Sequence, residues 1–297
     1  HGLTVQVIDG TVKSDYIKKT LNSIDKDTVM IGFSVMTSQV PLAFNLSKLI
    51  KAKYPEIPIV WGGIHPILFP EQTLRDSNID IVVTGEGYHA ILSLIDYLNG
   101  KIDLRQIRGV GFKNNSGNVV LNEPCESDDI GTLPHIDYSI LEDIELYLSS
   151  KSVYQRELAG NNNERLDVML VLTGLGCCYK CQFCINVILK RSYRFRPAAS
   201  IIEEIKKLQE NYGANTFIFY DEDFFINKRR LFEFLDLVER ENLKFFWRAW
   251  ARVDYFNNKY IDRDLVLRLE RCGLRSIVMG GESGSQKVLD IIKKGIK

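Results

Sequence analysis

Residues 166–184 have the sequence LDVMLVLTGLGCCYKCQFC, in which an apolar run passes directly into a loop with four cysteines. The run at 167–173 has the length and the Val and Leu content of a buried strand. Cys177, Cys181 and Cys184 follow it with the spacing C-x3-C-x2-C. Adjacent side chains point in different directions, so we interpret Cys178 as a spacer. The sequence predicts a strand that delivers three thiols to one short loop.

Three thiolates on one loop can ligate three irons of a four-iron cluster and leave the fourth iron without a protein ligand. An open coordination position is typical of catalytic metal centres, a rule stated for zinc and extended here by analogy. The alternatives are a zinc knuckle or buried thiols, but structural zinc takes four ligands and no histidine follows His135. We therefore predict that Cys177, Cys181 and Cys184 bind an iron–sulfur cluster of the 4Fe-4S type.

Strands and helices alternate on the carboxyl side of this loop. The pattern predicts helices at 200–212, 229–239, 265–272 and 285–294, and strands at 216–220, 244–249 and 276–279. Together with 167–173 they form four strand–helix units of a (β/α) barrel, whose active site lies at the carboxyl ends of its strands. Four strands cannot close a barrel, so we expect the C-terminal strands to lie beyond this sequence.

The amino-terminal half alternates in the same way. Short apolar runs at 3–9, 28–35, 57–61 and 79–84 predict strands buried on both faces, and 40–53 and 90–98 predict helices. This pattern is typical of a doubly wound parallel sheet of the Rossmann-like kind, which binds ligands beyond the carboxyl ends of its strands. Glycine-rich turns follow two of these strands. We expect the first strand of this sheet to precede the sequence.

These patterns divide the chain into three parts. Residues 1–108 form the first α/β domain, and residues 166–297 form the partial barrel. Residues 109–165 are predicted to be a connector, which begins with a hairpin at 110–113 and 118–122 around the turn residues 114–117.

The composition excludes several classes of protein. With 45% hydrophobic and 26% charged residues the chain is a folded globular protein. Lys and Arg number 38, as do Asp and Glu, so no net charge attracts nucleic acid. No apolar stretch reaches the roughly 18 residues of a membrane span, and the first residues lack a signal-peptide pattern. Four of six cysteines share one loop, which favours a metal site in the reducing cytoplasm over a disulfide scaffold.

The cysteine loop, with aromatic Phe183 before its last cysteine, resembles the signature of radical S-adenosylmethionine (SAM) enzymes. Residues 220–223 (YDED), Arg252 and residues 280–284 (GGESG) follow successive strands, as the SAM-binding segments of that family do. The resemblance implies a SAM site formed by Phe183, Tyr220, Asp221, Glu222, Arg252, Gly281, Glu282 and Ser283. The alternatives are helix capping by the acidic residues, a surface ion pair for Arg252 and core packing for Phe183.

Residues 62–66 (GGIHP) and 84–87 (TGEG) resemble the cobalamin-binding domain that precedes many radical SAM enzymes. The resemblance covers nearly the whole chain and places the corrin across the carboxyl edge of the sheet. It implies cobalamin contacts by Ser34, Thr37, Ser38, Gly62, Gly63, His65, Gly85, Glu86 and Gly87. The chain has no D-x-H-x-x-G segment, so we expect His65 to be a core or loop histidine and not a cobalt ligand.

The resemblance to cobalamin-binding-domain radical SAM enzymes implies a methyltransferase that acts on an unactivated carbon of a small molecule. In such enzymes reductive cleavage of SAM releases a 5′-deoxyadenosyl radical, and cobalamin carries the methyl group. An electron donor such as flavodoxin or ferredoxin is an implied partner. The first alternative is a radical SAM cyclase, oxidase or rearrangement enzyme with the same cofactors. A more distant alternative is a non-catalytic sensor module that binds the cluster or cobalamin.

Overall fold

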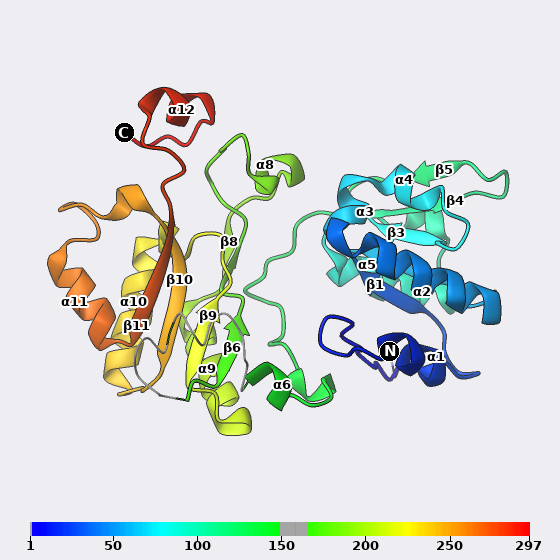
Figure 1. The fold of residues 1–297 in the computed structure, drawn as a ribbon, viewed down its shortest axis with the longest axis horizontal. Coiled ribbons are helices and arrows are strands. Elements are labelled where there is room, and N and C mark those ends of the chain that lie inside the picture. The colour runs from blue at the N-terminus through cyan, green and yellow to red at the C-terminus, as the bar shows by residue number, and fades with distance from the viewer. Residues whose placement is uncertain (1, 149–157, 159–164) are drawn as a thin grey trace. The chain divides into compact units, whose positions relative to one another are not determined.

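The computed structural model describes residues 2–148, 158 and 165–297. It divides into two compact units (Figure 1), of which the first ends at Asp128 and the second runs from Asp129 to Lys297. Each unit has a sheet and a hydrophobic core of its own. Part of the predicted connector, residues 149–157 and 159–164, lies outside the described residues.

The first unit is built on a five-stranded sheet. Its strands, in order across the sheet, are β1 (Ile31–Ser34), β2 (Ile59–Gly62), β3 (Ile81–Val83), β4 (Val110–Lys113) and β5 (Val119–Leu121). β1, β2 and β3 are parallel, as predicted. Ile59 and Trp61 belong to one core cluster, whereas Val60 between them belongs to another. Both faces of the sheet are therefore buried, which explains its continuous apolar runs.

The hairpin of β4 and β5 extends this sheet. β4 pairs antiparallel with β3, with Gly111 opposite Val82, and β5 pairs antiparallel with β4. We expected this hairpin to belong to the connector, outside the parallel sheet, and the first domain to end at residue 108. The sheet is mixed instead, because the edge of β3 carries backbone groups that the hairpin satisfies. The first unit accordingly continues to Asp128.

Helices cover both faces of the first sheet (Figure 1). They are α1 (Tyr16–Ser23), α2 (Val40–Lys53), α3 (Ile64–Leu68), α4 (Pro70–Leu74) and α5 (Gly87–Leu98), with 3-10 turns η1 (Thr37–Gln39) and η2 (Leu104–Gln106). α2 buries Leu46 and Ile50 against one face. α5 buries Ala90 and Leu94 against the other. The doubly wound arrangement is confirmed.

Residues 3–9 form no strand in the structure, so the strand prediction there was wrong. Leu3 and Val5 are exposed, and β1 occupies the edge of the sheet. An apolar run supplies side chains suited to a strand, but a strand also needs a neighbour for its backbone hydrogen bonds. Residues 3–9 have the composition of a strand but pair with no other strand among the described residues.

The second unit is built on a parallel sheet of four strands. These are β6 (Val168–Val171), β9 (Thr216–Phe219), β10 (Phe246–Arg252) and β11 (Leu274–Gly280), and their order across the sheet is β11-β10-β9-β6. Val168 lies opposite Thr216, and Arg252 lies opposite Gly280. All four strands run in the same direction, so their carboxyl ends meet at one edge. The predicted partial barrel is confirmed.

Helices α9 (Ala198–Tyr212), α10 (Lys228–Arg240) and α11 (Arg263–Arg271) cover one face of this sheet (Figure 1). Aromatic rings fill the space between them. The rings of Phe219, Phe224 and Phe234 lie 5.1, 5.5 and 5.5 Å from the ring of Trp247. All four side chains are fully buried. Their packing supports the end of β9 on the face of the sheet that the helices cover.

The remaining elements lie at the sheet edges and in the connections. They are η3 (Tyr138–Ile140), α6 (Glu145–Leu148), β7 (Gly174–Leu175), α8 (Ile185–Leu189), β8 (Arg194–Phe195), η4 (Phe224–Ile226), η5 (Val253–Tyr255) and α12 (Gln286–Ile291). β7 and β8 form a short antiparallel pair beside the cysteine loop.

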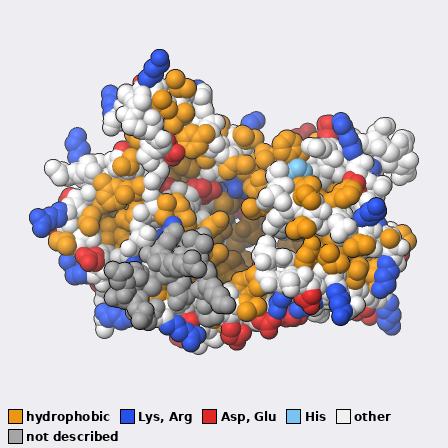
Figure 2. All heavy atoms as spheres, in the orientation of Figure 1, with side chains coloured by type: hydrophobic (Ala, Val, Ile, Leu, Met, Phe, Trp, Pro, Cys, Tyr) orange, Lys and Arg blue, Asp and Glu red, His pale blue; other side chains and the backbone are white. Residues whose placement is uncertain are grey.

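Basic side chains are spread over the visible face of the molecule without a single dominant patch (Figure 2). Within the described parts of the chain, no helix combines the length and the apolar character needed to cross a bilayer.

Candidate functional site

The cysteine loop joins β7 to α8 and starts from a constrained glycine. Gly176 has φ of 81°, and a Cβ there would lie 2.2 Å from the carbonyl oxygen of Ser192. At the other end, Cys184 is the N-cap residue of α8, and its N–H donates to the carbonyl oxygen of Cys181 at 3.0 Å. A glycine with positive φ at one end and a tight turn at the other therefore define the path of the loop.

The three predicted cluster ligands are all inside this loop. Cys181 is buried, Cys177 and Cys184 are half-buried, and Cys178 is exposed. Burial raises the pKa of Cys177 to about 11, and binding of a metal by this thiol would require loss of its proton. The described residues hold no ready-made group of three or more His, Cys, Asp or Glu side chains for a single metal ion. Three thiols on one loop fit a four-iron cluster better than tetrahedral zinc.

The first acidic residue after β9 is turned into the protein. Asp221 is buried, and its carboxylate accepts hydrogen bonds from the N–H and the hydroxyl of Thr173 at 2.8 and 2.6 Å. It also lies 3.3 Å from the guanidinium of Arg230 on α10. Among the predicted SAM-binding residues, Asp221 therefore joins the end of β6 to α10 and does not share the exposed surface of its neighbours.

The next two acidic residues reach toward the loop. Glu222 accepts a hydrogen bond from the N–H of Gly176 at 2.9 Å. Asp223 accepts one from the hydroxyl of Tyr255 at 2.9 Å and one from the N–H of Phe225 at 3.1 Å. Burial raises the pKa of Asp223 to about 7 in spite of these hydrogen bonds. Glu222 thus holds the start of the cysteine loop.

Tyr220, like Glu222, is an exposed member of this segment. Its side chain is 57% exposed, and its ring packs edge-to-face on Trp250, with ring centroids 5.8 Å apart. Trp250 lies on β10, where it and Arg252 point to the same side of the strand because they are two residues apart. Tyr220 and Trp250 therefore form an aromatic surface at the carboxyl edge of the sheet.

Arg252 ends β10 and is buried. Its guanidinium lies 3.7 Å from the centroid of the Tyr179 ring, which belongs to the cysteine loop. Its Nε and Nη2 donate to both carboxylate oxygens of Asp254 at 2.9 and 3.1 Å, and Nη2 also donates to the carbonyl oxygen of Lys294 at 3.0 Å. These contacts, all with other residues of the second unit, place Arg252 beside the cysteine loop.

The segment after β11 completes this edge. Glu282 has φ of 62° and accepts a hydrogen bond from Nζ of Lys294 at 2.9 Å. The same Nζ lies 5.8 Å from the ring centroid of Phe183. Gly281 is exposed with open space around its Cα, and Ser283 donates its N–H to the Gly281 carbonyl oxygen at 2.8 Å. The structure therefore brings Phe183, Glu282 and Lys294 together beside the cysteines.

The predicted cobalamin residues follow the strands of the first unit. Ser34 ends β1, and Thr37 and Ser38 lie in η1, all three exposed. His65 on α3 is buried, with its Nδ1 3.3 Å from the hydroxyl of Thr37. Burial lowers the pKa of His65, which favours the neutral imidazole. Gly63 has φ of 89°, and a Cβ there would lie 2.6 Å from the backbone nitrogen of Val35.

Gly62, at the end of β2, and Gly85, Glu86 and Gly87, after β3, lie at the same carboxyl edge. A Cβ added to Gly85 would meet no atom within 4 Å. The carboxylate of Glu86 accepts a hydrogen bond from the N–H of Asp128 at 3.4 Å. Open backbone at glycines and exposed hydroxyls suit a large polar ligand such as cobalamin.

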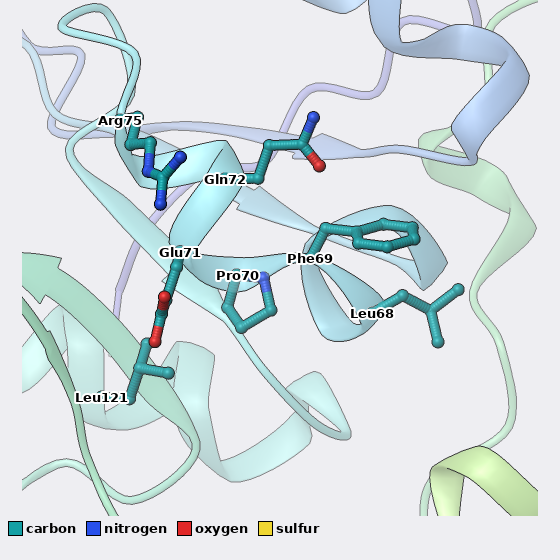
Figure 3. Close-up of a pocket in the computed structure, with 7 residues that line it drawn as sticks. All are labelled: Leu68, Phe69, Pro70, Glu71, Gln72, Arg75 and Leu121. Carbon is teal, nitrogen blue, oxygen red and sulfur yellow. The ribbon is translucent and has the colours of Figure 1, made fainter.

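A separate cavity of about 440 Å³ lies on the first unit beside α4. Figure 3 shows Leu68 and Phe69 pointing to the same side of it. Its lining residues are Leu68, Phe69, Pro70, Glu71, Gln72, Arg75 and Leu121. None of them is a predicted cofactor residue, so this cavity is distinct from the candidate site.

Sequence reasoning missed several residues that support the site, namely Tyr179, Gly176, Trp250, Tyr255 and Lys294. Two of them, Gly176 and Tyr179, carry a local signal because they lie inside or beside the cysteine motif. Tyr255 and Lys294 become neighbours of the loop, and Trp250 a neighbour of Tyr220, only through the parallel pairing of β9, β10 and β11.

Comparison with protein families separates the same two parts. The B12 binding domain model matches residues 1–95, and the Radical SAM superfamily model matches residues 171–297. An uncharacterised methyltransferase of Pyrococcus horikoshii is 29% identical over 300 residues, which cover 98% of this chain and 60% of the relative. The anaerobic magnesium-protoporphyrin IX monomethyl ester cyclase of Rubrivivax gelatinosus is 25% identical, over 98% of this chain and 50% of the relative. The chain thus spans between half and two thirds of these relatives.

Solved structures share the fold. The cobalamin-dependent SAM radical enzyme OxsB matches with a TM-score of 0.75 and 22% identity, over 96% of this chain and 39% of OxsB. The radical SAM methyltransferase TsrM of Kitasatospora setae matches with a TM-score of 0.73 and 18% identity, over 97% of this chain and 55% of TsrM. Each of these matches includes both units in one chain. The protein therefore combines a B12 binding domain with a domain of the Radical SAM superfamily.

Proposed function

We propose that the protein is a cobalamin-dependent radical SAM methyltransferase that acts on an unactivated carbon of a small-molecule substrate. Its cofactors are a 4Fe-4S cluster, SAM and cobalamin. The observation that carries the proposal is the loop of three thiols at the carboxyl ends of four parallel strands. The P. horikoshii relative and the cytidylyl-2-hydroxyethylphosphonate methyltransferase of Streptomyces wedmorensis, which is 24% identical, support methyl transfer.

The residues of the second unit take complementary roles in this proposal. Cys177, Cys181 and Cys184 hold the cluster. When bound, the cluster supplies the electron that cleaves SAM, and cobalamin supplies the methyl group. Phe183 and Tyr220 offer exposed aromatic surface to SAM or substrate, both more than half exposed. The SAM site is surrounded by carboxylates and open backbone from Glu222, Gly281, Glu282 and Ser283. Asp221 and Arg252 support this site through contacts in the interior of the second unit.

The residues of the first unit bind cobalamin in this proposal. Gly62, Gly85 and Gly87 let the ligand approach the backbone closely, as glycine lacks a Cβ. At Gly63 the Cβ position is filled by the backbone of Val35, so Gly63 shapes the turn after β2. Ser34, Thr37 and Ser38 offer hydroxyls, and Glu86 offers a carboxylate. His65 orients the Thr37 hydroxyl through its Nδ1 and does not bind cobalt in this proposal, because the chain has no D-x-H-x-x-G segment.

A radical SAM cyclase with the same cofactors is the second candidate. The magnesium-protoporphyrin cyclases of Rubrivivax gelatinosus and Cereibacter sphaeroides are each 25% identical to this chain. In either case we propose that a flavodoxin or ferredoxin delivers electrons. We place the protein in the cytoplasm without a nucleic-acid partner, because its six free cysteines suit a reducing compartment and its net charge is zero.

The proposal is tested on the protein reconstituted without oxygen and supplied with reductant, hydroxocobalamin and SAM. S-adenosylhomocysteine and 5′-deoxyadenosine are quantified by mass spectrometry. We expect cobalamin-dependent S-adenosylhomocysteine from the wild type. Cys181→Ala should lose the four-iron absorbance and 5′-deoxyadenosine. Cys178→Ala is the matched control because Cys178 is the exposed neighbour of Cys177.

The outcomes separate the candidates. 5′-Deoxyadenosine without S-adenosylhomocysteine would favour the cyclase or another reaction without methyl transfer. A fully loaded protein that never cleaves SAM would favour the sensor module. Full iron content and SAM cleavage in Cys181→Ala would refute the cluster assignment.

A further inference from the structure

Tyr179 is the central residue between the first two cluster cysteines, and it is in contact with the ends of other elements. The guanidinium Cζ of Arg252 lies over the ring of Tyr179, 3.7 Å from the ring centroid. Its hydroxyl lies 3.1 Å from the hydroxyl of Tyr255 in η5. Tyr179 is thus in contact with Arg252 and Tyr255, which lie 73 and 76 positions further along the chain.

The direction of the hydrogen bonds follows from their donors. The hydroxyl of Tyr255 donates its only proton to Oδ2 of Asp223 at 2.9 Å. When Asp223 is ionised, the hydroxyl of Tyr179 therefore donates to the oxygen of Tyr255, because each phenol has one proton. Asp223 is itself fixed by the N–H of Phe225 at 3.1 Å. The chain Tyr179–Tyr255–Asp223 thus connects the loop to the end of β9.

Arg252 is itself fixed by three hydrogen bonds. It donates to Asp254 twice and to the carbonyl oxygen of Lys294 once. The segment of Lys294 also reaches the other side of the loop, because the N–H of Gln182 donates to the carbonyl oxygen of Ile292 at 2.9 Å. The loop is therefore attached on both sides of Cys181.

We propose that Tyr179 is a positioning residue that anchors the cysteine loop through Arg252 and Tyr255 before the cluster binds. This inference rests on the proposed function, since it assigns the loop to a cluster. Arg252 then acts through Tyr179, and not by direct contact with SAM. Its buried guanidinium has Nε and Nη2 engaged in hydrogen bonds and one face covered by the ring.

The physical need for such an anchor lies in the loop itself. Residues 177–184 carry three ligands, and each must reach its iron from one short segment. A loop that is ordered in advance spares the ordering entropy on binding, so cluster assembly and SAM alignment are favoured. The stacked guanidinium and the phenol hydrogen bond hold the middle of the C-x3-C span, where a cluster bond gives no support.

The first test measures amide hydrogen exchange of residues 176–184 in the iron-free protein. Tyr179→Phe keeps the ring on Arg252 and loses one hydrogen bond, so exchange should rise about fivefold. Tyr179→Leu also loses the cation–π contact and should raise exchange about a hundredfold. Lys180→Leu is the matched control, since Lys180 is the exposed next residue of the loop, and should exchange at the wild-type rate. Thermal unfolding of each variant verifies that the unit is folded.

The second test uses reconstituted protein. The electron paramagnetic resonance spectrum of the reduced cluster is recorded with and without SAM. Tyr179→Phe should keep the wild-type response to SAM, whereas in Tyr179→Leu a smaller fraction of clusters should respond. Arg252→Met should also reduce the responding fraction, and the loss in the double variant should be smaller than the sum of the two single losses, because either change alone already removes the shared cation–π contact.

The two tests distinguish failure of the anchor from failure of the proposed function. Wild-type exchange and a wild-type SAM response in Tyr179→Leu would overturn the anchor and leave the proposed function intact. Additive effects of Tyr179→Leu and Arg252→Met would also overturn it. If the wild type takes up no four-iron cluster, the proposed function fails, and the exchange of the iron-free loop still shows whether the anchor exists.

Discussion

Gly176 decides the direction in which the cysteine loop leaves β7. Its positive φ and the carbonyl oxygen of Ser192 at 2.2 Å from a Cβ leave no room for another residue. Its N–H also donates to Glu222. The residue before the first cysteine therefore couples the loop to β8 and to the end of β9.

Gly176→Ala should destabilise the second unit by about 3 kcal/mol, because it combines positive-φ strain with a backbone clash. We expect lower iron content after reconstitution, measured together with denaturant unfolding. Gly213→Ala is the control within the same unit, since Gly213 has φ of 66° with no atom within 4 Å of its Cβ position. That variant should lose only about 1 kcal/mol and keep its iron. Equal losses of stability in both variants would show that the backbone clash at Gly176 adds nothing to the strain of its positive φ.

Asp223 gives the second unit a pH-dependent stability. Its pKa is raised to about 7 by burial and by Asp221, against the opposing effects of Tyr255, Phe225 and Arg252. An aspartate in an unfolded chain has a pKa of about 3.9. Between about pH 4 and pH 7 the folded state therefore binds more protons, so the free energy of unfolding contributed by Asp223 falls as the pH rises.

Asp223→Asn should remove this slope. In iron-free protein, the wild type should lose stability relative to the variant between about pH 4 and pH 7 and change little relative to it above pH 8. Denaturant unfolding at a series of pH values provides the measurement. A constant difference across the range would show that the carboxyl group of Asp223 titrates normally.

Residue types near the site were predictable where a motif carried them. The cysteines, Phe183 and Glu222 follow from local patterns, and the structure places all of them at one edge. Asp221 shares the same local pattern as Glu222, yet it faces Arg230 in the interior. Which of two neighbouring carboxylates faces the loop depends on the packing of α10, and that packing leaves no trace in the local sequence.

Among the elements, α10 supports the ends of two strands through one side chain. Arg230 donates to the carbonyl oxygens of Thr173 and Phe224 at 2.8 and 2.9 Å and pairs with Asp221. Arg230 and Asp221 are both almost fully buried. α10 therefore holds the ends of β6 and β9 in the positions from which the cysteine loop and the acidic segment extend.

Arg230→Met should destabilise the second unit by about 3–5 kcal/mol, because it leaves the Asp221 carboxylate buried without its cation. Arg229→Met, the adjacent exposed residue of α10, should change stability by less than about 0.5 kcal/mol. Urea unfolding compares the two variants. Adding Asp221→Asn to Arg230→Met should restore part of the loss, and the absence of any restoration would place the cost elsewhere.

Periodicity predicted most elements of both units. α2 spans Val40–Lys53, as expected, and the four strands of the second sheet have the predicted order along the chain. The run at 3–9 and the hairpin of β4 and β5 show the limit of periodicity. A periodic pattern indicates which face of an element is apolar, but the partner of a sheet edge is decided by every strand that competes for it.

At the scale of the whole molecule, each unit has its own core and its own candidate cofactor. The B12 binding domain match lies in the first unit, and the Radical SAM match lies in the second. Changes that damage one core should therefore leave the other cofactor in place.

Gly63→Ala should lower cobalamin retention and leave the iron content unchanged. A Cβ at Gly63 would lie 2.6 Å from the Val35 nitrogen, and φ there is 89°, so the turn after β2 must move. Gly32→Ala is the control, since a Cβ on Gly32 meets no atom within 4 Å. Cobalamin absorbance and iron per chain are measured after gel filtration. Loss of iron in Gly63→Ala would contradict independent loading.

The sequence alone determined the domain types, the two α/β units and the glycine turns, and it predicted the three cysteines as cluster ligands. These features are encoded by covalent spacing and by short periodicities, which survive without knowledge of distant contacts. Only the tertiary structure decided that the hairpin joins the first sheet, that Asp221 faces Arg230, and that Tyr179 lies on Arg252. Such contacts join residues far apart in the chain, and they depend on strand order, register and helix packing acting together.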